Sequence, residues 1–583
     1  MCMARRRNLI IFGMLTLCVL NLLFMHASVL QSSQIEEPLD GVSIIDNICR
    51  VILDIWVLIT LSIICFRGQL KYSILVSFLI TFIWSFSNVL YSRFFFHYIT
   101  LSSMEEAGAL SDGLVINSML AGIQIRDVYY VIVLMVFLFL YHKCISISVR
   151  IWYFFKLVVV CVLSIYVFDL LSHMFYCVSQ ADLRYWGYYK RRVGRRVFGQ
   201  NHFLGLPIHA HFHNGSVKSL VIESIMSIQD NIELDDNQKS IINNALKESE
   251  SSMIASIPNQ DVKNIIFILI ESQMSFVIDM SVGGKEVTPC LNALKADSTV
   301  YYNGNVRSNI TLGESADGQY IYMTGLLPLR SMVTVSKACK RKLPGLPRQF
   351  KKIGITHSRM ILPTSSSLWR QDDMCQQYGF DRLYASNDYP GEHMQTLTDK
   401  QVFELASMID KKESDAPFFS IVLTASMHQP YDKNIDSTFV INNPSMNEEL
   451  KYYLNACHYT DHSIGDYLLS LKHNGLYDNS LIVIASDHHV HSTDFGGGIT
   501  NNIPFFIING YLSQNIYKGM CNQLDLYTTI INIVNIPNAW PGLGRSLLNN
   551  NYGSFNFLNL KNRWDVSEWI LMSDYFKAED TFL

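Results

Sequence analysis

Long apolar runs dominate the first third of the chain, and shorter apolar runs alternate with polar segments in the rest. A helix needs about 20 apolar residues to cross a bilayer. Residues 128–141 form the shortest candidate, which spans a membrane only if residues from 123 onward contribute. The pattern predicts a transmembrane domain of about five helices over residues 1–177. The five runs are residues 9–25, 51–66, 72–91, 128–141 and 152–176.

The charges in the short loops predict the orientation of these helices. Lys and Arg occur at 5–7, 67–71 and 143–150, whereas the loop over 31–47 is acidic and has neither. Since positive loops stay in the cytoplasm, five crossings place the C-terminal part outside it. If residues 128–141 did not cross, this orientation would reverse. A signal peptide is the alternative for the first run, but no small-residue cleavage site follows it, so retention is favoured.

Residues 178–262 form a polar connecting region with an acidic helical stretch around 233–251. Near its start, residues 184–196 are aromatic and basic. This stretch is either an interfacial element that holds anionic lipid head groups near the active site, or a surface anchor without a substrate role. The sequence leaves both interpretations open.

Strand-like and helix-like segments alternate from residue 263 to the end of the chain. The run NIIFILI over 264–270, apolar from 265 onward, predicts a buried strand. This alternation predicts an α/β fold in which helices cover both faces of a mostly parallel sheet. Ligands bind such sheets at the carboxyl ends of the strands. Further strands are predicted at 418–423, 481–485 and 503–508, and helices at 289–296, 447–472 and 523–534.

Three metal-ligating residue types stand where predicted strands end. Glu271 directly follows NIIFILI, and Asp487 and His488 directly follow LIVIAS. Two carboxylates with one imidazole suit Mn²⁺, Zn²⁺ or Mg²⁺. For each residue considered alone, the more common role is different: a carboxylate at a strand end caps a neighbouring helix, and a histidine is structural. The prediction of a metal site therefore depends on the three residues together.

The segment GESADGQ over 313–319 precedes a helical run at 320–326. Ser315 is therefore predicted at a helix N-terminus, where backbone N–H groups and the helix dipole favour a phosphate or an alkoxide. A hydroxyl there that also binds a divalent metal loses its proton readily and acts as a nucleophile. The alternatives are that Ser315 is only an N-cap, or that Thr311 is the nucleophile.

Composition supports a membrane part joined to an ordinary globular part. Hydrophobic residues make up 49% and charged residues 16% of the chain, compared with roughly 25% charge in a soluble domain. With 583 residues, at least two structural units are expected. The formal net charge of −4 argues against a nucleic-acid partner, because such proteins carry a basic domain.

Several blocks in the C-terminal part occur in a recognisable order. They are NIIFILIES, TPCLNAL, GESADGQ, MTGLLPL, SLWRQDDMCQQYGFD, TASMHQPY, SDHH and the closing DLYTTIINIVNIP…GLGRSLL. In order and spacing they resemble the lipoteichoic acid synthase-like branch of the alkaline phosphatase/sulfatase superfamily, which also has five preceding membrane helices. The resemblance implies a doubly wound, extracytoplasmic catalytic domain over residues 263–583.

The resemblance also implies one catalytic metal ion, usually manganese. Its ligands correspond to Glu271, the nucleophile Ser315, Asp487 and His488 in this chain. The family nucleophile is usually a threonine in a Gly-Lys-Thr-Ser-Asp context. Here the hydroxyl is kept by serine, and Glu314 stands where the family has lysine.

Three further residues resemble the family's substrate site. His428 corresponds to a histidine that contacts the head group or protonates the leaving group, although it is equally explained as a loop hydrogen-bonder. Trp369 resembles a substrate-lining tryptophan. The family's arginine two residues later is Gln371 here, with Arg370 alongside, which leaves the head-group preference open.

The function implied is a membrane-bound transferase of a bacterial inner or cytoplasmic membrane. It would move a phosphoglycerol-type head group from a phospholipid donor to a glycan or glycolipid acceptor through a covalent phospho-serine. A phosphoethanolamine transferase is the alternative. A sulfatase or phosphodiesterase is less favoured, because the nearest match to the sulfatase motif C/S-x-P-x-R, at 326–330, begins with leucine. The intact set of ligands argues against a non-enzymatic sensor.

Overall fold

The protein is described by a computed structural model that divides into two compact units. The first comprises residues 1–104, 119–229 and 330–332, and the second comprises 105–118, 230–329 and 333–583. We call them the membrane unit and the catalytic unit and describe each by itself. Apart from a few isolated positions, the structure describes residues 2–32, 41–105, 122–145, 147–148, 211–212, 215–228, 231–254, 263–391, 396–490, 499–510, 516–548 and 557–578.

The membrane unit contains four helices that are long and apolar enough to cross a membrane. The run at 128–141, short by sequence, is extended by a turn of 3₁₀-helix at Ile125–Asp127 into an apolar helical span over Ile125–Lys143. The fifth predicted run, 152–176, lies outside the described residues apart from isolated positions. The four helices are α1 (Cys2–Ser32), α2 (Gly41–Cys65), α3 (Leu70–Phe95) and α6 (Val128–Lys143).

Part of the predicted connecting region packs on these helices. Helix α10 (Ser216–Ile228) begins against Asp54 of α2, whose carboxylate accepts the N–H groups of Ser216 and Val217 at 2.7 and 3.2 Å. A carboxylate at this place stabilises the helix because it satisfies free N–H groups at the positive end of the dipole. The basic stretch at 184–196 lies outside the described residues.

A central eight-stranded sheet organises the catalytic unit, with strand order β10-β4-β9-β8-β1-β7-β5-β6. Strand β1 pairs in parallel with β7 and β8, whereas β9 runs antiparallel to both β8 and β4. Every residue of β1 is buried, as its six consecutive apolar residues after Asn264 predict for a strand with both faces covered. The strands are β1 (Asn264–Ile270), β4 (Tyr301–Arg307), β5 (His357–Ile361), β6 (Arg382–Tyr384), β7 (Phe418–Leu423), β8 (Ser480–Ser486), β9 (Asn502–Ile508) and β10 (Cys521–Asn522).

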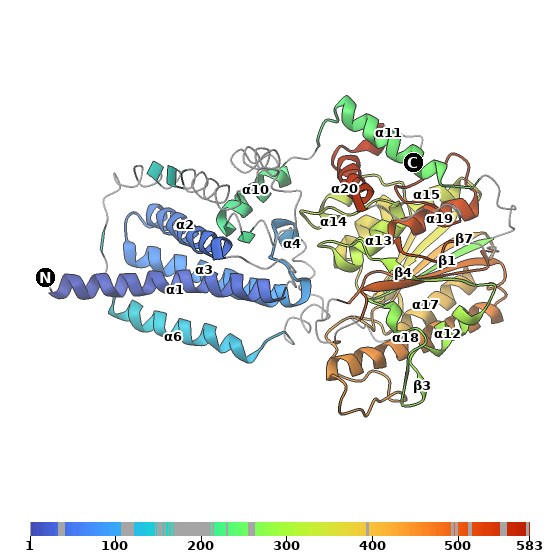
Figure 1. The fold of residues 1–583 in the computed structure, drawn as a ribbon, viewed down its shortest axis with the longest axis horizontal. Helices are drawn as coiled ribbons and strands as arrows, with labels where there is room; N and C mark the ends of the chain where they lie inside the picture. The colour runs from blue at the N-terminus through green and yellow to red at the C-terminus, as the bar shows by residue number, and fades with distance from the viewer. Residues whose placement is uncertain are drawn as a thin grey trace. The chain divides into compact units, whose positions relative to one another are not determined.

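Helices cover both faces of this sheet (Figure 1). One face carries α12 (Pro289–Ala296), α17 (Asp399–Lys412) and α18 (Glu448–His473). The other carries α13 (Glu314–Thr324), α15 (Leu346–Lys351) and α19 (Leu524–Val534). The α/β class and the mostly parallel sheet with two covered faces are therefore confirmed. Further helices of this unit are α11 (Asp236–Ser251), α14 (Val335–Ala338), α16 (Gln371–Tyr378), α20 (Phe557–Met572) and α21 (Tyr575–Ala578).

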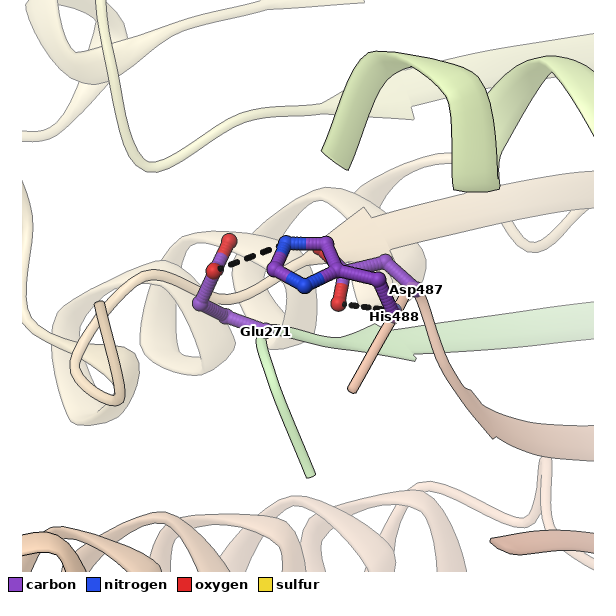
Figure 2. A group of neighbouring side chains, drawn as sticks. All are labelled: Glu271, Asp487 and His488. Carbon is purple, nitrogen blue, oxygen red and sulfur yellow. Dashed lines mark hydrogen bonds and ion pairs between the residues drawn. The ribbon is translucent and has the colours of Figure 1, made fainter. Parts of the chain in front are cut away.

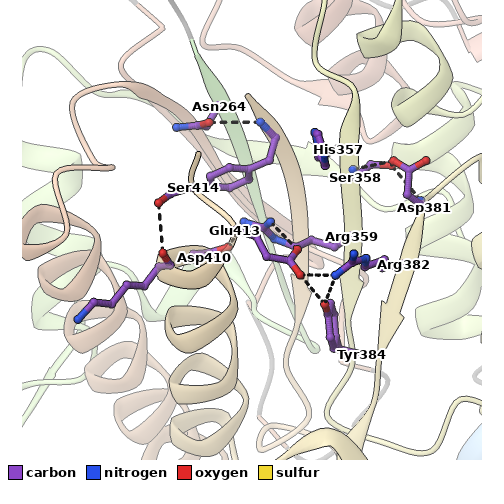
Figure 3. Close-up of polar contacts among 12 residues, drawn as sticks. Asn264, His357, Ser358, Arg359, Asp381, Arg382, Tyr384, Asp410, Glu413 and Ser414 are labelled. Atoms are coloured by element: carbon purple, nitrogen blue, oxygen red, sulfur yellow. Dashed lines mark hydrogen bonds and ion pairs between the residues drawn. The ribbon is translucent and has the colours of Figure 1, made fainter. Parts of the chain in front are cut away.

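A partly buried ionic network attaches the edge strand β6 and its neighbour β5 to the end of α17 (Figure 3). Arg359 of β5 is buried, stacks on the ring of Phe418 and bonds to Asp410 at 2.7 Å. Glu413 accepts from Arg359 at 3.2 Å and also pairs with Arg382 of β6 at 2.5 Å. A buried arginine is tolerated here because its charge is paired and hydrogen-bonded.

Candidate active site

The residues predicted to bind a metal meet at the carboxyl ends of the two central strands. Glu271 follows β1, while Asp487 and His488 follow β8, which is the parallel neighbour of β1. Figure 2 shows the three side chains converging. Their ligand atoms all lie within 4.8 Å of one another, and all three residues are buried.

Ser315 completes this group from the first turn of α13. Its hydroxyl donates to Glu271 Oε2 at 2.9 Å and lies 3.2 Å from His488 Nε2. The N-cap of α13 is Gly313, so Ser315 does not have the capping role considered as an alternative. Thr311, the rival nucleophile, lies in the preceding turn, and its hydroxyl bonds to Asp317 Oδ2 at 2.8 Å.

The spacing of these atoms fits one small cation. His488 Nε2 lies 3.4 Å from Glu271 Oε1, 3.6 Å from Asp487 Oδ2 and 3.2 Å from Ser315 Oγ. Oxygen and nitrogen atoms bound tetrahedrally at about 2.1 Å from one ion are about 3.4 Å apart. The donor set of two carboxylates, one imidazole and one hydroxyl therefore fits a divalent metal both in chemistry and in size.

The proton affinities of the three groups depend strongly on one another. Burial alone would raise the pKa of Glu271, but hydrogen bonding and the charge of His488 lower it well below its usual range. Burial and the charge of Glu271 raise the pKa of Asp487 to about 8. Burial disfavours the His488 imidazolium, yet Asp487 and Glu271 raise its pKa well above the usual value. The site therefore favours positive charge at its centre, which a bound cation would supply.

Neighbouring groups that the sequence did not point to hold the ligands in place. Ser272, whose φ is 52°, donates its N–H to Asp487 Oδ1 at 2.8 Å and its hydroxyl to Glu271 Oε1 at 2.7 Å. Gln523 donates to the backbone oxygen of Asp487 at 2.6 Å. Adjacency to Glu271 is the one sequence signal for Ser272, and Gln523 has none because it lies 36 residues from Asp487.

Gly318 allows α13 to lie directly on the strand end that carries Asp487. A Cβ atom at this position would stand 2.3 Å from the backbone oxygen of Asp487. Real Cβ atoms essentially never approach that closely. The absence of a side chain therefore sets the distance between Ser315, which is on the same helix, and the metal-ligating group.

His428 stands in the loop after β7, with its ring orientation fixed by the backbone. Its Nδ1 lies 2.6 Å from the carbonyl oxygen of Gln429, so Nδ1 is the protonated nitrogen. The charge of His428 contributes to lowering the pKa of Glu271, which places the imidazole near the metal-ligating group. Nε2 makes no hydrogen bond to any residue that the structure describes.

Trp369 and Arg370 occupy a turn in which both residues have a φ of 52°. Left-handed backbone at non-glycine residues is costly and is often found at functional sites. The Arg370 guanidinium pairs with Asp373 at 2.8 Å. Gln371 next to it donates to Gln319 at 2.6 Å.

Comparison with known proteins shows what the domain that holds this site resembles. The Sulfatase family model matches residues 263–536. Lipoteichoic acid synthase 2 of Bacillus subtilis is 24% identical over 497 residues, which are 79% of this chain and 72% of that protein. The lipoteichoic acid synthase of Staphylococcus saprophyticus is 23% identical over 496 residues, with the same two coverages.

A solved structure matches both units of the chain. It is the integral membrane protein lipooligosaccharide phosphoethanolamine transferase A of Neisseria meningitidis, with a TM-score of 0.53 and 14% identity over 93% of this chain and 98% of that one. At this identity it supports the fold alone, an apolar helical unit followed by a sulfatase-like domain. Residues 263–536 therefore form a domain that resembles sulfatases, the membrane unit has helices apolar enough to cross a membrane, and the resemblance of the chain to lipoteichoic acid synthases is confirmed.

Proposed function

We propose that this protein is a membrane-bound phosphotransferase that moves a phosphoglycerol-type head group from a phospholipid to a hydroxyl of a glycan or glycolipid. The observation that carries the proposal is the Ser315 hydroxyl, held between Glu271 at 2.9 Å and His488 at 3.2 Å. Similarity to lipoteichoic acid synthases over most of the chain supports the donor and acceptor classes.

Glu271, Ser315, Asp487 and His488 would hold one divalent ion, with Mn²⁺ proposed and Zn²⁺ or Mg²⁺ as alternatives. When bound, such an ion lowers the pKa of the serine hydroxyl and offsets the charge of the phosphate. The mixture of hard oxygen donors and a single imidazole favours Mn²⁺ over softer ions.

The residues of the chain account for the transfer of protons and bonds. Ser315 Oγ, oriented by its hydrogen bond to Glu271 Oε2, loses its proton to solvent and forms a bond to the donor phosphorus. The bond between phosphorus and the diacylglycerol oxygen breaks, and the imidazolium form of His428, which carries a proton on each ring nitrogen, gives its Nε2 proton to the departing oxygen. In the second half His428 Nε2 takes the proton of the acceptor hydroxyl as that oxygen bonds to the same phosphorus, the bond between phosphorus and Ser315 Oγ breaks, and Ser315 Oγ takes up a proton from solvent.

Trp369, Arg370 and His428 are proposed to bind the head group of the donor. Arg370 is paired with Asp373, which reduces the charge it presents to a phosphate. We also propose that the catalytic unit lies outside the cytoplasm, on the basis of five crossings and the Lys and Arg bias of the short loops.

A phosphoethanolamine head group is the second candidate, and Glu314 favours it. Glu314 is 9% exposed, directly precedes Ser315 and has a φ of 44°. The charge of Glu314 contributes to raising the pKa of His488, so the Glu314 carboxylate lies near the proposed reacting atoms. A buried carboxylate at this place would attract an ammonium group, whereas a glycerol head group offers only neutral hydroxyls.

The test is to incubate the purified full-length protein with phosphatidylglycerol or phosphatidylethanolamine and to measure diacylglycerol release and the mass of the Ser315 peptide. A glycerophosphate adduct supports the first head group, and a phosphoethanolamine adduct supports the second. Ser315→Ala is expected to abolish the adduct, whereas Thr311→Ala keeps it detectable. Turnover by Ser315→Ala at the wild-type rate would overturn the covalent mechanism.

A further inference from the structure

Helix α18 carries two histidines, His458 and His462, that lie one turn apart. Residues four apart share one face of a helix. The centroids of the two rings are 4.5 Å apart. His458 is buried at 8% exposure, and His462 is exposed. One imidazole of the pair is therefore buried, and the other is accessible to solvent.

The ring of His458 is fixed on two sides. Its Nδ1 lies 2.8 Å from Asp436 Oδ2, and the ring of Phe439 stacks on it with centroids 4.1 Å apart and planes 5° from parallel. Asp436 is itself held, because its other oxygen accepts the N–H and hydroxyl of Thr438 at 2.7 and 2.6 Å. These contacts fix the orientation of the imidazole before any ligand binds.

This arrangement leaves ring nitrogens available on the same helix face. Within the described part of the chain, His458 Nε2 and both nitrogens of His462 make no hydrogen bond. A carboxylate that binds one imidazole nitrogen while the other faces outward is the usual outer support of a metal-ligating histidine. The carboxylate orients the ring and makes the opposite nitrogen a stronger donor.

We propose that His458 and His462 bind one transition-metal ion of the Zn²⁺, Cu²⁺ or Ni²⁺ type, at a second metal site on α18. Imidazole suits these borderline ions, whereas Mn²⁺ and Mg²⁺ prefer sites rich in oxygen. Two protein ligands leave the remaining coordination positions to water, so the site is open on the side of His462. Asp436 acts as a positioning residue through His458.

The protonation of His458 agrees with this role. Burial lowers the pKa of its imidazole, and the neighbouring His462 and Lys285 lower it further, against the opposing effect of Asp436. A neutral ring is the form that binds a metal. Lys285 donates to the backbone oxygen of Thr438 at 3.1 Å, so its positive charge stands near the site and limits the affinity for a cation.

The site also joins two parts of the catalytic unit. Asn455, on α18, accepts the N–H groups of Ile435 and Asp436 at 2.8 and 2.9 Å, which docks that loop on the helix. An ion on His458 Nε2 makes the Nδ1 proton more acidic and strengthens its bond to Asp436. Metal binding is therefore expected to hold the loop more firmly on α18.

The experiment uses the untagged full-length protein in detergent, stripped of metal, with Asp487→Ala in the background to remove the active-site metal. Calorimetric titration with Zn²⁺ or Cu²⁺ is expected to detect one ion per chain, and Mn²⁺ none. His462→Ala, a change at an exposed position, is expected to weaken binding by about tenfold or more, and Asp436→Asn by about 10-fold. The matched control is His473→Ala, an exposed histidine at the end of the same helix, which leaves binding unchanged.

Electron paramagnetic resonance of the Cu²⁺ complex adds a readout that a structural role alone would not change. Coupling to two nitrogens is expected in the parent protein and to one in His462→Ala. Two results would overturn the proposal: no Zn²⁺ or Cu²⁺ binding in the Asp487→Ala background, or equal affinity with and without His462.

Discussion

Replacing Gly318 with alanine tests whether close packing of α13 sets the geometry of the active site. The new Cβ atom would stand 2.3 Å from the backbone oxygen of Asp487, compared with about 3.4 Å for ordinary contact. The helix and the strand end must therefore separate by about 1.1 Å. Because the opposing atoms are backbone, no side-chain rotation relieves the contact.

The expected loss of activity is larger than the expected loss of stability. A misplacement of about 1 Å between catalytic groups costs roughly 100-fold in rate, equivalent to about 2.7 kcal/mol. Overpacking costs about 1–3 kcal/mol of folding free energy, and the higher helix propensity of alanine returns about 1 kcal/mol. The variant should therefore remain folded while its phospho-enzyme formation falls steeply.

The assay is single-turnover diacylglycerol release, measured together with metal content and thermal unfolding. The matched control is Gly465→Ala in α18, where the nearest atom to the new Cβ is Cys290 Sγ at an ordinary 3.5 Å. This control should keep wild-type activity and gain up to about 1 kcal/mol of stability from helix propensity. Wild-type turnover and full metal content in Gly318→Ala would refute the argument from close packing.

Three further predictions concern the ionic network, the metal and the topology. Asp410→Ala leaves the buried charge of Arg359 without its closest partner, so urea unfolding should report a loss of about 3–5 kcal/mol; a loss below about 1 kcal/mol would contradict this. Asp487→Ala should remove both bound metal and activity from a folded protein, as measured by elemental analysis and circular dichroism, and full metal retention would refute the site. In intact cells a membrane-impermeant thiol reagent should label Lys472→Cys and spare the exposed Cys65, and the opposite pattern would reverse the proposed orientation.

The central strands were predictable because each is a mostly apolar run. The predicted strands at 264–270 and 418–423 match β1 and β7 residue for residue, and the one at 481–485 lies within β8. Strands β4, β5, β6 and β10 were missed. Strand β4 contains Gly304 and two asparagines, and β6 and β10 have only three and two residues. None of these three strands therefore shows a clear alternation of apolar and polar residues.

The residues proposed for the site stand out in the sequence because they directly follow predicted strands or precede a predicted helix. Glu271, Ser315, Asp487 and His488 are brought together as expected. Their supports depend on contacts between distant segments, which a single sequence does not encode locally. Gly318 is an example. The sequence shows only a glycine that weakens a predicted helix, and its close contact with the Asp487 backbone becomes known only from the structure.

The separation of the site residues along the chain has a consequence for the timing of synthesis. Ser315 is translated 172 residues before Asp487, which must enter the sheet on β8 beside β1 to reach it. At about 5–20 residues per second, the ribosome needs roughly 10–35 s to cover that interval. During this time Ser315 and Glu271 exist without Asp487 and His488. The four-residue site therefore cannot assemble until β8 and the two residues after it have been made.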